Sequence, residues 1–244
     1  MIKIVSLVRP LAALPLEECE RHYRDVHMPF VRATARSLPG FLTYHNDLVL
    51  TRYDVAGGWS QRPDIWRIAT ARFEGDPRLP LEPMADGMNE DHRHFLSHYR
   101  FFKAVEETLV DRLSGQTALA KFALHIDRSP ELTREEAERE LQPRVERLAE
   151  LASGAFGLRL LVRDRVLAEC ETRPIDEPGQ ECLPHVELPD TPRIAHLDLY
   201  FDQHQWGREF FAAHRQELLP LLGFQAFRRV KLYELDETGG VDKR

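Results

Sequence analysis

His27 is the residue whose type and setting best suit acid–base chemistry in this chain. It lies two residues before Pro29, and a proline inside a helix removes an N–H and clashes with the carbonyl four residues earlier, here that of Asp25. We therefore expect the helix to kink or end here and to turn the imidazole toward a pocket. Because histidine titrates near neutral pH, His27 could be the general acid or base of an elimination or isomerisation. A histidine that only bonds the last helix carbonyls is the structural alternative.

Two polar residues further along the chain could assist His27. Tyr44 and Asn46 alternate with Thr43 and His45 in a strand-like run, so they share one face of a strand. A phenol and an amide on one face could polarise a carbonyl or hold an enolate oxygen. Tyrosine is also an ordinary strand former, so a structural role for Tyr44 is the alternative.

Two further groups of polar residues have a possible site chemistry. His94 and His98 are four residues apart, so on a helix both could face one metal ion. Their segment lacks the glutamate of a His-Glu-x-x-His motif and the spacing indicates no third ligand, so we favour a solvated helix face and expect no metal. His196, Asp198 and Tyr200 alternate along one strand-like run and indicate either an interior polar network or a hydrated sheet face.

Composition and missing motifs exclude several classes of protein. The chain has 244 residues with a formal net charge of −7, which disfavours nucleic acid as a partner. No apolar run approaches the ~18–20 residues that span a bilayer, and three scattered cysteines do not suggest a disulfide framework. The sequence has no Gly-x-Gly-x-x-Gly segment, P-loop or Gly-x-Ser-x-Gly elbow, so we expect no cofactor. These features predict a soluble, cytoplasmic protein that acts on a small molecule.

The elements that must position these residues occur twice. Residues 3–7 and 121–125 have the pattern of the same short strand, and the same offset of 118 aligns Leu14, Glu17, Glu18, Glu20 and Arg21 with identical residues of the second half. Each half then has the pattern β-α-β-β-α-β.

The first half predicts a strand at 3–7, a helix from Pro15 to about Ser37 that Pro39-Gly40 ends, strands at 41–51 and 65–73, a helix near 89–99 and a strand at 102–110. The second half predicts a strand at 119–126, a helix from the capping box of Thr133 and Glu136 to Ala152, strands at 155–168 and 194–201, a helix at 205–222 and a strand at 226–234, with a proline-rich insertion at 171–192.

The first half of the sequence resembles the EthD domain family. In that family the first helix ends in an aromatic residue followed by a His-x-Pro triplet. The matching residues are Tyr23 and His27-Met28-Pro29, then Tyr44 and Asn46 beyond the turn into the second strand, and, more loosely, Asp64-Ile65-Trp66 before the third strand. The resemblance covers about residues 1–110 and fades over 117–236, where the order of elements persists.

The resemblance implies a ferredoxin-like unit of the dimeric α/β-barrel superfamily. We therefore predict an α+β fold in which two β-α-β-β-α-β repeats pack their antiparallel sheets into a single-chain α+β barrel, with one repeat at 1–115 and a second, degenerate repeat at 116–244. The counterpart of His27 is Val145, so we expect one catalytic pocket, in the first half. Such a pseudo-dimeric chain closes its barrel without a partner. The sequence does not decide whether two such chains form a further homodimer.

Members of this superfamily include dehydratases and cyclases of aromatic polyketides, lactone isomerases, cofactor-free monooxygenases and haem enzymes. We predict a cofactor-independent lyase (dehydratase) or isomerase for a small aromatic or polyketide-like hydroxy-carbonyl compound, with His27 and Tyr44 as catalytic residues. The alternatives are a cofactor-free monooxygenase or haem-binding oxidoreductase of the same fold, and a non-catalytic small-molecule binding protein. The substrate-binding residues that the resemblance and the spacing suggest are Tyr23, Asn46, Asp64, Trp66, His92 and Phe95.

Overall fold

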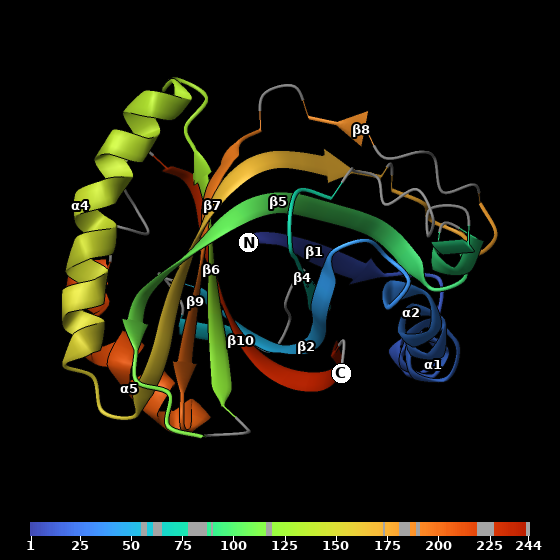
Figure 1. Ribbon diagram of the computed structural model, residues 1–244, viewed down its shortest axis with the longest axis horizontal. Helices are drawn as coiled ribbons and strands as arrows, with labels where there is room; N and C mark the ends of the chain where they lie inside the picture. The colour runs from blue at the N-terminus through green and yellow to red at the C-terminus, as the bar shows by residue number, and fades with distance from the viewer. Residues whose placement is uncertain are drawn as a thin grey trace.

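The strands of the computed structural model form one curved antiparallel sheet with helices packed at two opposite sides (Figure 1). The structure describes residues 1–54, 58–60, 65–77, 87–88, 90–115, 119–172, 174–180, 186–188, 191–218 and 227–242. The first half contains β1 (Ile2–Pro10), α1 (Leu16–His22), a π-helical turn (Tyr23–His27), α2 (Met28–Ala35), β2 (Phe41–Asp54), β3 (Gly58–Ser60), β4 (Arg67–Phe73) and β5 (Leu96–Asp111). The second half contains β6 (Ala120–Arg128), α4 (Arg134–Ser153), β7 (Leu158–Glu171), β8 (Val186–Glu187), β9 (Arg193–Phe201), α5 (His204–Ala213) and β10 (Phe227–Asp242). Among the described residues, no helix combines the length and the apolar character that crossing a bilayer requires.

The sheet closes on itself within one chain. The strand order is β10-β6-β9-β7-β5-β1-β4-β2-β3, and β10 also pairs with β2. Counted within its own half, each group of four long strands has the order 4-1-3-2, as β5-β1-β4-β2 and as β10-β6-β9-β7. The two halves are joined by the antiparallel pairs β5–β7 and β10–β2. Closure through these two junctions removes the sheet edges that would otherwise remain unpaired.

The first helix differs from the predicted one at its centre. The chain stays helical through Pro29, which occupies the first turn of α2, where a missing N–H costs little. The kink that the proline predicts is replaced by the π-helical turn, whose closing bond runs from the N–H of Met28 to the carbonyl of Tyr23. The predicted stop at Gly40 is confirmed. This glycine has a φ of +71°, and a Cβ atom there would lie 2.2 Å from the carbonyl oxygen of Glu74.

The helix predicted near 89–99 is wrong over its second part. Residues 90–92 are helical, but β5 begins at Leu96 and pairs with β1, where His98 lies opposite Arg9. His94 and His98 therefore do not share a helix face, and the metal pair considered from their spacing does not form. Pairing with a neighbouring strand makes residues 96–99 a strand, and no local sequence pattern indicates that pairing.

The second half follows the predicted order of elements, with different ends. Thr133 and Glu136 form the predicted capping box at the start of α4, and Val145 is buried on the face of that helix that packs on the sheet. The final strand continues to Asp242, because its extension pairs with β2. Within the insertion at 171–192, the two residues of β8 pair with the end of β7.

Buried charges occupy the inside of the closed sheet. Lys3 on β1 lies 2.7 Å from Asp164 on β7, and Lys121 on β6 lies 3.0 Å from Asp47 on β2. Each lysine of one half is thus paired with an aspartate of the other half. Asp198 on β9 joins the two pairs, since its Oδ2 is 2.8 Å from the Nζ of Lys3 and 3.3 Å from that of Lys121. All five side chains are at most 7% exposed.

His196 extends this network beside Asp198. Its Nε2 lies 2.8 Å from the Oδ1 of Asp198, and its Nδ1 lies 3.0 Å from the Nδ1 of His125. The Nη1 of Arg193 donates to the same His125 nitrogen at 3.2 Å. Burial alone would raise the pKa of Asp198, but Lys121, Lys3 and His196 outweigh it and hold that pKa well below its usual range.

We predict that Asp198→Asn destabilises the protein by about 3–5 kcal/mol at neutral pH, because it leaves the buried ammonium groups of Lys3 and Lys121 short of one carboxylate. Urea unfolding measures the loss. Asp202→Asn, which breaks the pair of Asp202 with Arg159 at the surface, is the control and should cost much less. Since the pKa of Asp198 is lowered, its contribution is complete above about pH 3.8 and is lost as the pH falls through the lowered value. Equal losses in the two variants would contradict the interior network.

Candidate functional site

The π-helical turn places two of the predicted site residues under the first helix. Tyr23 and His27 are both buried there, with ring centroids 4.8 Å apart. A single π turn inside a helix is rare and often marks a functional site. It widens the helix by one residue, so the two rings face the outer side of the sheet, where Tyr44 and Phe95 also lie.

A carboxylate that the sequence did not single out as a partner of His27 links two histidines. The Oδ2 of Asp91 lies 2.6 Å from the Nδ1 of His27, and its Oδ1 lies 2.7 Å from the Nε2 of His22. Burial opposes ionisation of Asp91, but the hydrogen bonds from His27 and His22 outweigh it and lower its pKa. Asp91 is therefore an acceptor, and each imidazole donates to it. These two bonds fix the ring orientation and the tautomer of each histidine, as a carboxylate does in a catalytic dyad.

Two tyrosines bring their hydroxyl groups together beside His27. The oxygens of Tyr23 and Tyr44 are 3.3 Å apart. Burial raises the pKa of both phenols, that of Tyr23 well above its usual value. Both hydroxyls therefore stay protonated at neutral pH. One donates to the other, so the remaining hydroxyl proton can be donated to an oxygen that gains negative charge.

A second network, centred on Arg67, surrounds this pair. The guanidinium of Arg67 donates to the Oδ1 of Asn46 at 2.6 Å and to Glu20 at 2.5 Å, and it lies 4.1 Å from the centre of the Tyr23 ring. The indole N–H of Trp66 donates to the other oxygen of Glu20 at 2.8 Å. Asn46 and Trp66 therefore hold Arg67 and Glu20, neither of which sequence reasoning identified. The repeat did align Glu20 with Glu138, but that match says nothing of its contacts.

The residues predicted from the sequence form one cluster, with one exception. His27, Tyr23 and Trp66 all pack around Phe95, with ring centroids 5.3 to 6.3 Å away. His92 packs against His27 and Tyr99 and is 3% exposed. Tyr44 and Asn46 lie on the same face of β2, as predicted, and contact this cluster through Tyr23 and Arg67. Asp64 lies outside the described residues.

A hollow of about 530 Å³ opens beside this cluster, on the outer side of α1. Its lining consists of Leu14, Glu18, Arg21, His22, Asp25, Val26 and His94. His27 is only 4% exposed and does not line it, whereas His22 does. The bond from His22 to Asp91 thus connects the hollow with the buried imidazole.

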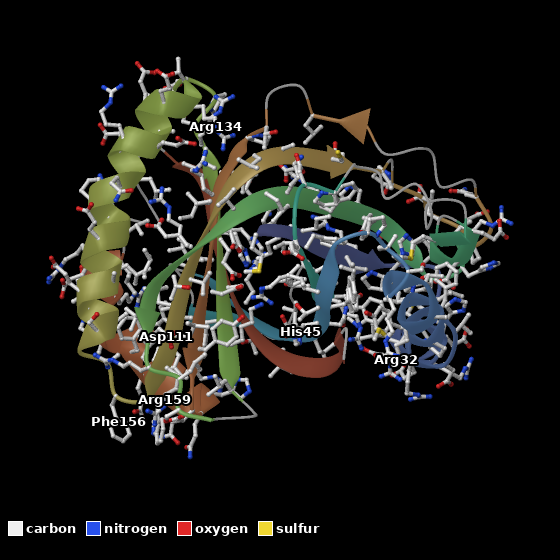
Figure 2. All side chains as sticks on the ribbon, in the orientation of Figure 1. Arg32, His45, Asp111, Arg134, Phe156 and Arg159 are labelled. Atoms are coloured by element: carbon white, nitrogen blue, oxygen red, sulfur yellow. The ribbon has the colours of Figure 1, made fainter. Side chains whose placement is uncertain are left out.

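A group of potential metal ligands lies elsewhere, inside the closed sheet. Asp164, His196 and Asp198 bring their ligand atoms within 4.8 Å of one another. The ammonium of Lys3 already stands between the two carboxylates, 2.7 and 2.8 Å from them. A metal ion would have to displace a buried lysine from both partners, so these residues fit an ion-pair network better than a metal centre. Figure 2 shows the side chains that project from the strands of the curved sheet and from the helices at its two sides.

Comparison with known proteins identifies the fold. No protein-family model matches the chain, and no curated protein sequence matches it. Among solved structures, a proposed monooxygenase from Fusobacterium nucleatum subsp. nucleatum superposes with a TM-score of 0.54 at 11% identity, over 99% of this chain and 94% of that one. Two further structures are less similar. A proposed monooxygenase from Lactobacillus acidophilus has a TM-score of 0.44 at 10% identity, over 99% of this chain and 95% of that one. A mutant chlorite dismutase from Candidatus Nitrospira defluvii has a TM-score of 0.49 at 10% identity, over 96% of this chain and 91% of that one. At such identity the likeness extends to the mixed α/β fold with its curled antiparallel sheet.

We predict that Asp91→Asn destabilises the protein by about 1.5–3 kcal/mol, because one amide cannot accept a hydrogen bond from both histidines. Urea unfolding at pH 7 measures the change, and Asp25→Asn, an exposed pair with Arg24 on the same helical segment, is the control. The pKa of Asp91 is lowered, so its contribution is present above its usual value of 3.8 and disappears as the pH falls through the lowered one. A variant as stable as Asp25→Asn would show that the bridge is not formed.

Proposed function

We propose that the chain is a cofactor-independent enzyme, a lyase (dehydratase) or isomerase, that moves a proton on a small aromatic or polyketide-like hydroxy-carbonyl compound. The observation that carries the proposal is the bridge of Asp91 between His22 and His27. One carboxylate orients two imidazoles, and a dehydration needs both a base and an acid. The EthD-like match around His27 and the reading of the chain as two ferredoxin-like repeats, the second degenerate, belong to the same proposal.

The proposed role of each histidine follows from the ring nitrogen that does not bond to Asp91. The Nδ1 of His27 donates to Asp91, and no described residue bonds to its Nε2. This nitrogen is the base that takes a proton from the carbon beside the carbonyl, a step that requires the buried ring to become accessible from the hollow. His22 faces the hollow and returns a proton to the departing hydroxyl, which leaves as water. In an isomerisation the proton returns to another carbon instead. Of the paired hydroxyls of Tyr23 and Tyr44, the one that accepts from the other stabilises the enolate oxygen, while Asn46 positions Arg67.

A cofactor-free monooxygenase is the second candidate function. The likeness in fold to a proposed monooxygenase supports it, together with the aromatic wall that Tyr23, Trp66 and Phe95 form beside His27. In this role His27 deprotonates a phenolic substrate, which then reacts with oxygen. Oxygen consumption with a quinol distinguishes this function from a lyase, which consumes none. A Soret band in the purified protein would instead favour the haem-binding alternative, and ligand binding without turnover of any compound would favour a binding protein.

We predict that His27→Ala lowers kcat/KM by about 10²–10⁴ because it removes the base. Aromatic β-hydroxyketones are the probes, and mass spectrometry follows the loss of one water and the uptake of deuterium from D₂O. His27→Asn is a second variant, since its amide still donates to Asp91 but cannot transfer a proton. It should be as inactive as His27→Ala while remaining closer to the parent in stability.

Val145→Ala is the matched control, because Val145 is the counterpart of His27 in the second half and is 1% exposed. It should lose on the order of 2 kcal/mol of stability through the missing methyl groups and keep its activity. Full turnover by His27→Asn, or a larger loss of activity in Val145→Ala than in His27→Ala, would place the reaction elsewhere.

A further inference from the structure

A second, smaller cavity of about 40 Å³ lies at one end of the closed sheet, where the two halves of the chain meet. Its lining consists of Leu7, Arg9, Ile65, His98, Arg100, His125, Asp127 and Arg193. None of these residues belongs to the cluster around His27. Three are arginines and one is a carboxylate, and a second carboxylate, that of Glu169, lies 2.5 Å from Arg100 and 4.0 Å from Arg193.

Arg193 is held rigidly at the wall of this cavity. Its Nε donates to the Oδ1 of Asp127 at 3.0 Å, and its Nη1 donates to the Nδ1 of His125 at 3.2 Å. Its guanidinium carbon lies 5.3 Å from the centre of the Phe102 ring, and the residue is 4% exposed. No described residue accepts a hydrogen bond from its Nη2. A guanidinium fixed in this way loses little side-chain entropy when it binds a further group.

Arg100 is arranged in the same way from the other half of the chain. Its Nε donates to Glu169 at 2.5 Å, and that carboxylate is fully buried. Within the described part of the chain, neither Nη nitrogen of Arg100 has a hydrogen-bond acceptor. The side chain of Arg100 is 15% exposed, so its fork lies where a ligand in the cavity could reach it.

The His98 side chain lies among the charged groups of the cavity. Burial lowers its pKa, and Arg9 on β1 and Arg100 on its own strand lower it further, against the opposing effect of Glu171 on β7, 3.7 Å away. Burial penalises a charge of either sign, so only the smaller effect of the two arginines favours an anion beside His98. The other titratable and charged groups of the cavity are His125, Asp127 and Arg193.

We propose that this cavity binds a small planar anion, a carboxylate group or an inorganic oxyanion of similar size, at the Nη nitrogens of Arg193 of the second half and Arg100 of the first that Glu169, Asp127 and His125, among the described residues, leave without an acceptor. A buried water needs ~10–15 Å³, so the cavity has room for about three water-sized atoms, which is the size of a carboxylate group. Guanidinium forks bind such groups through paired N–H bonds. The Leu7 and Ile65 side chains exclude bulkier and more strongly hydrated ligands.

Two consequences follow from this position. The anion joins β1 and β5 of the first half to β6 and β9 of the second, so its binding stabilises the folded chain by mass action. Binding also favours the protonated form of His98, so the anion binds more tightly as the pH falls through the range in which that residue titrates.

The test uses the full-length protein with sodium formate and sodium nitrate as separate probes, at constant ionic strength. Benzoate, which is too large for the cavity, is the control for a general salt effect. Thermal unfolding gives the apparent affinity, and NMR follows the titration of His98. Comparison of formate with nitrate distinguishes a carboxylate site from a site for inorganic oxyanions.

We expect saturable stabilisation by formate or nitrate but not by benzoate, with an upward shift of the His98 titration that the histidines outside the cavity do not share. Arg100→Lys keeps the charge beside Glu169 but loses the fork, and should weaken binding at least tenfold. Arg9→Gln changes an exposed residue of the rim, so it tests the cavity even if Arg100→Lys does not fold. Arg36→Gln, an exposed arginine at the end of α2, is the charge-matched control and should bind as the parent does.

Equal stabilisation by benzoate, an equal shift of all histidines, or equal loss in Arg9→Gln and Arg36→Gln would overturn the proposal. Its failure is separable from that of the proposed enzymatic function, since His27→Asn should bind formate or nitrate as the parent does.

Discussion

The exchange of buried ion pairs between the two halves is the constraint on which the rest of the structure depends. Lys3 reaches Asp164 and Lys121 reaches Asp47, so each half neutralises a charge that the other half buries. Neither lysine could stay charged in an apolar interior without its partner, and burial of an unpaired ion is far more costly than a lost surface pair. The strand pairs β5–β7 and β10–β2 bring these partners together, so closure of the sheet and neutralisation of its interior depend on each other.

The same strands hold the candidate active site on their outer side. Side chains alternate along a strand, so Asp47 points to the ionic interior while Tyr44 and Asn46 contact the residues under the first helix. A shift of register by one residue would exchange the two sides, leaving a carboxylate under the helix and an amide opposite Lys121. The interior ion pairs therefore set the register that presents the phenol and the amide to Tyr23 and Arg67.

The two proposed sites use these surroundings differently. Under the first helix, a single carboxylate orients two imidazoles beside a large hollow, an arrangement suited to proton transfer. At the end of the closed sheet, two guanidinium groups from different halves face a cavity with room for a few atoms, an arrangement suited to binding a small anion. The second half of the chain thus contributes to the molecule through its interior charges and through Arg193.

The sequence by itself determined the order of elements, the α4 capping box and the gathering of Tyr23, His27, Tyr44 and Asn46, because these follow from local periodicity and from a motif that resembles a known family. Only the tertiary structure decided which groups those residues bind. Asp91 reaches His27 across 64 positions of sequence, and Arg67 reaches Glu20 across 47. The π-helical turn and the strand character of residues 96–99 also depend on packing and strand pairing, whose energies arise from residues distant in the sequence and leave no periodic signal.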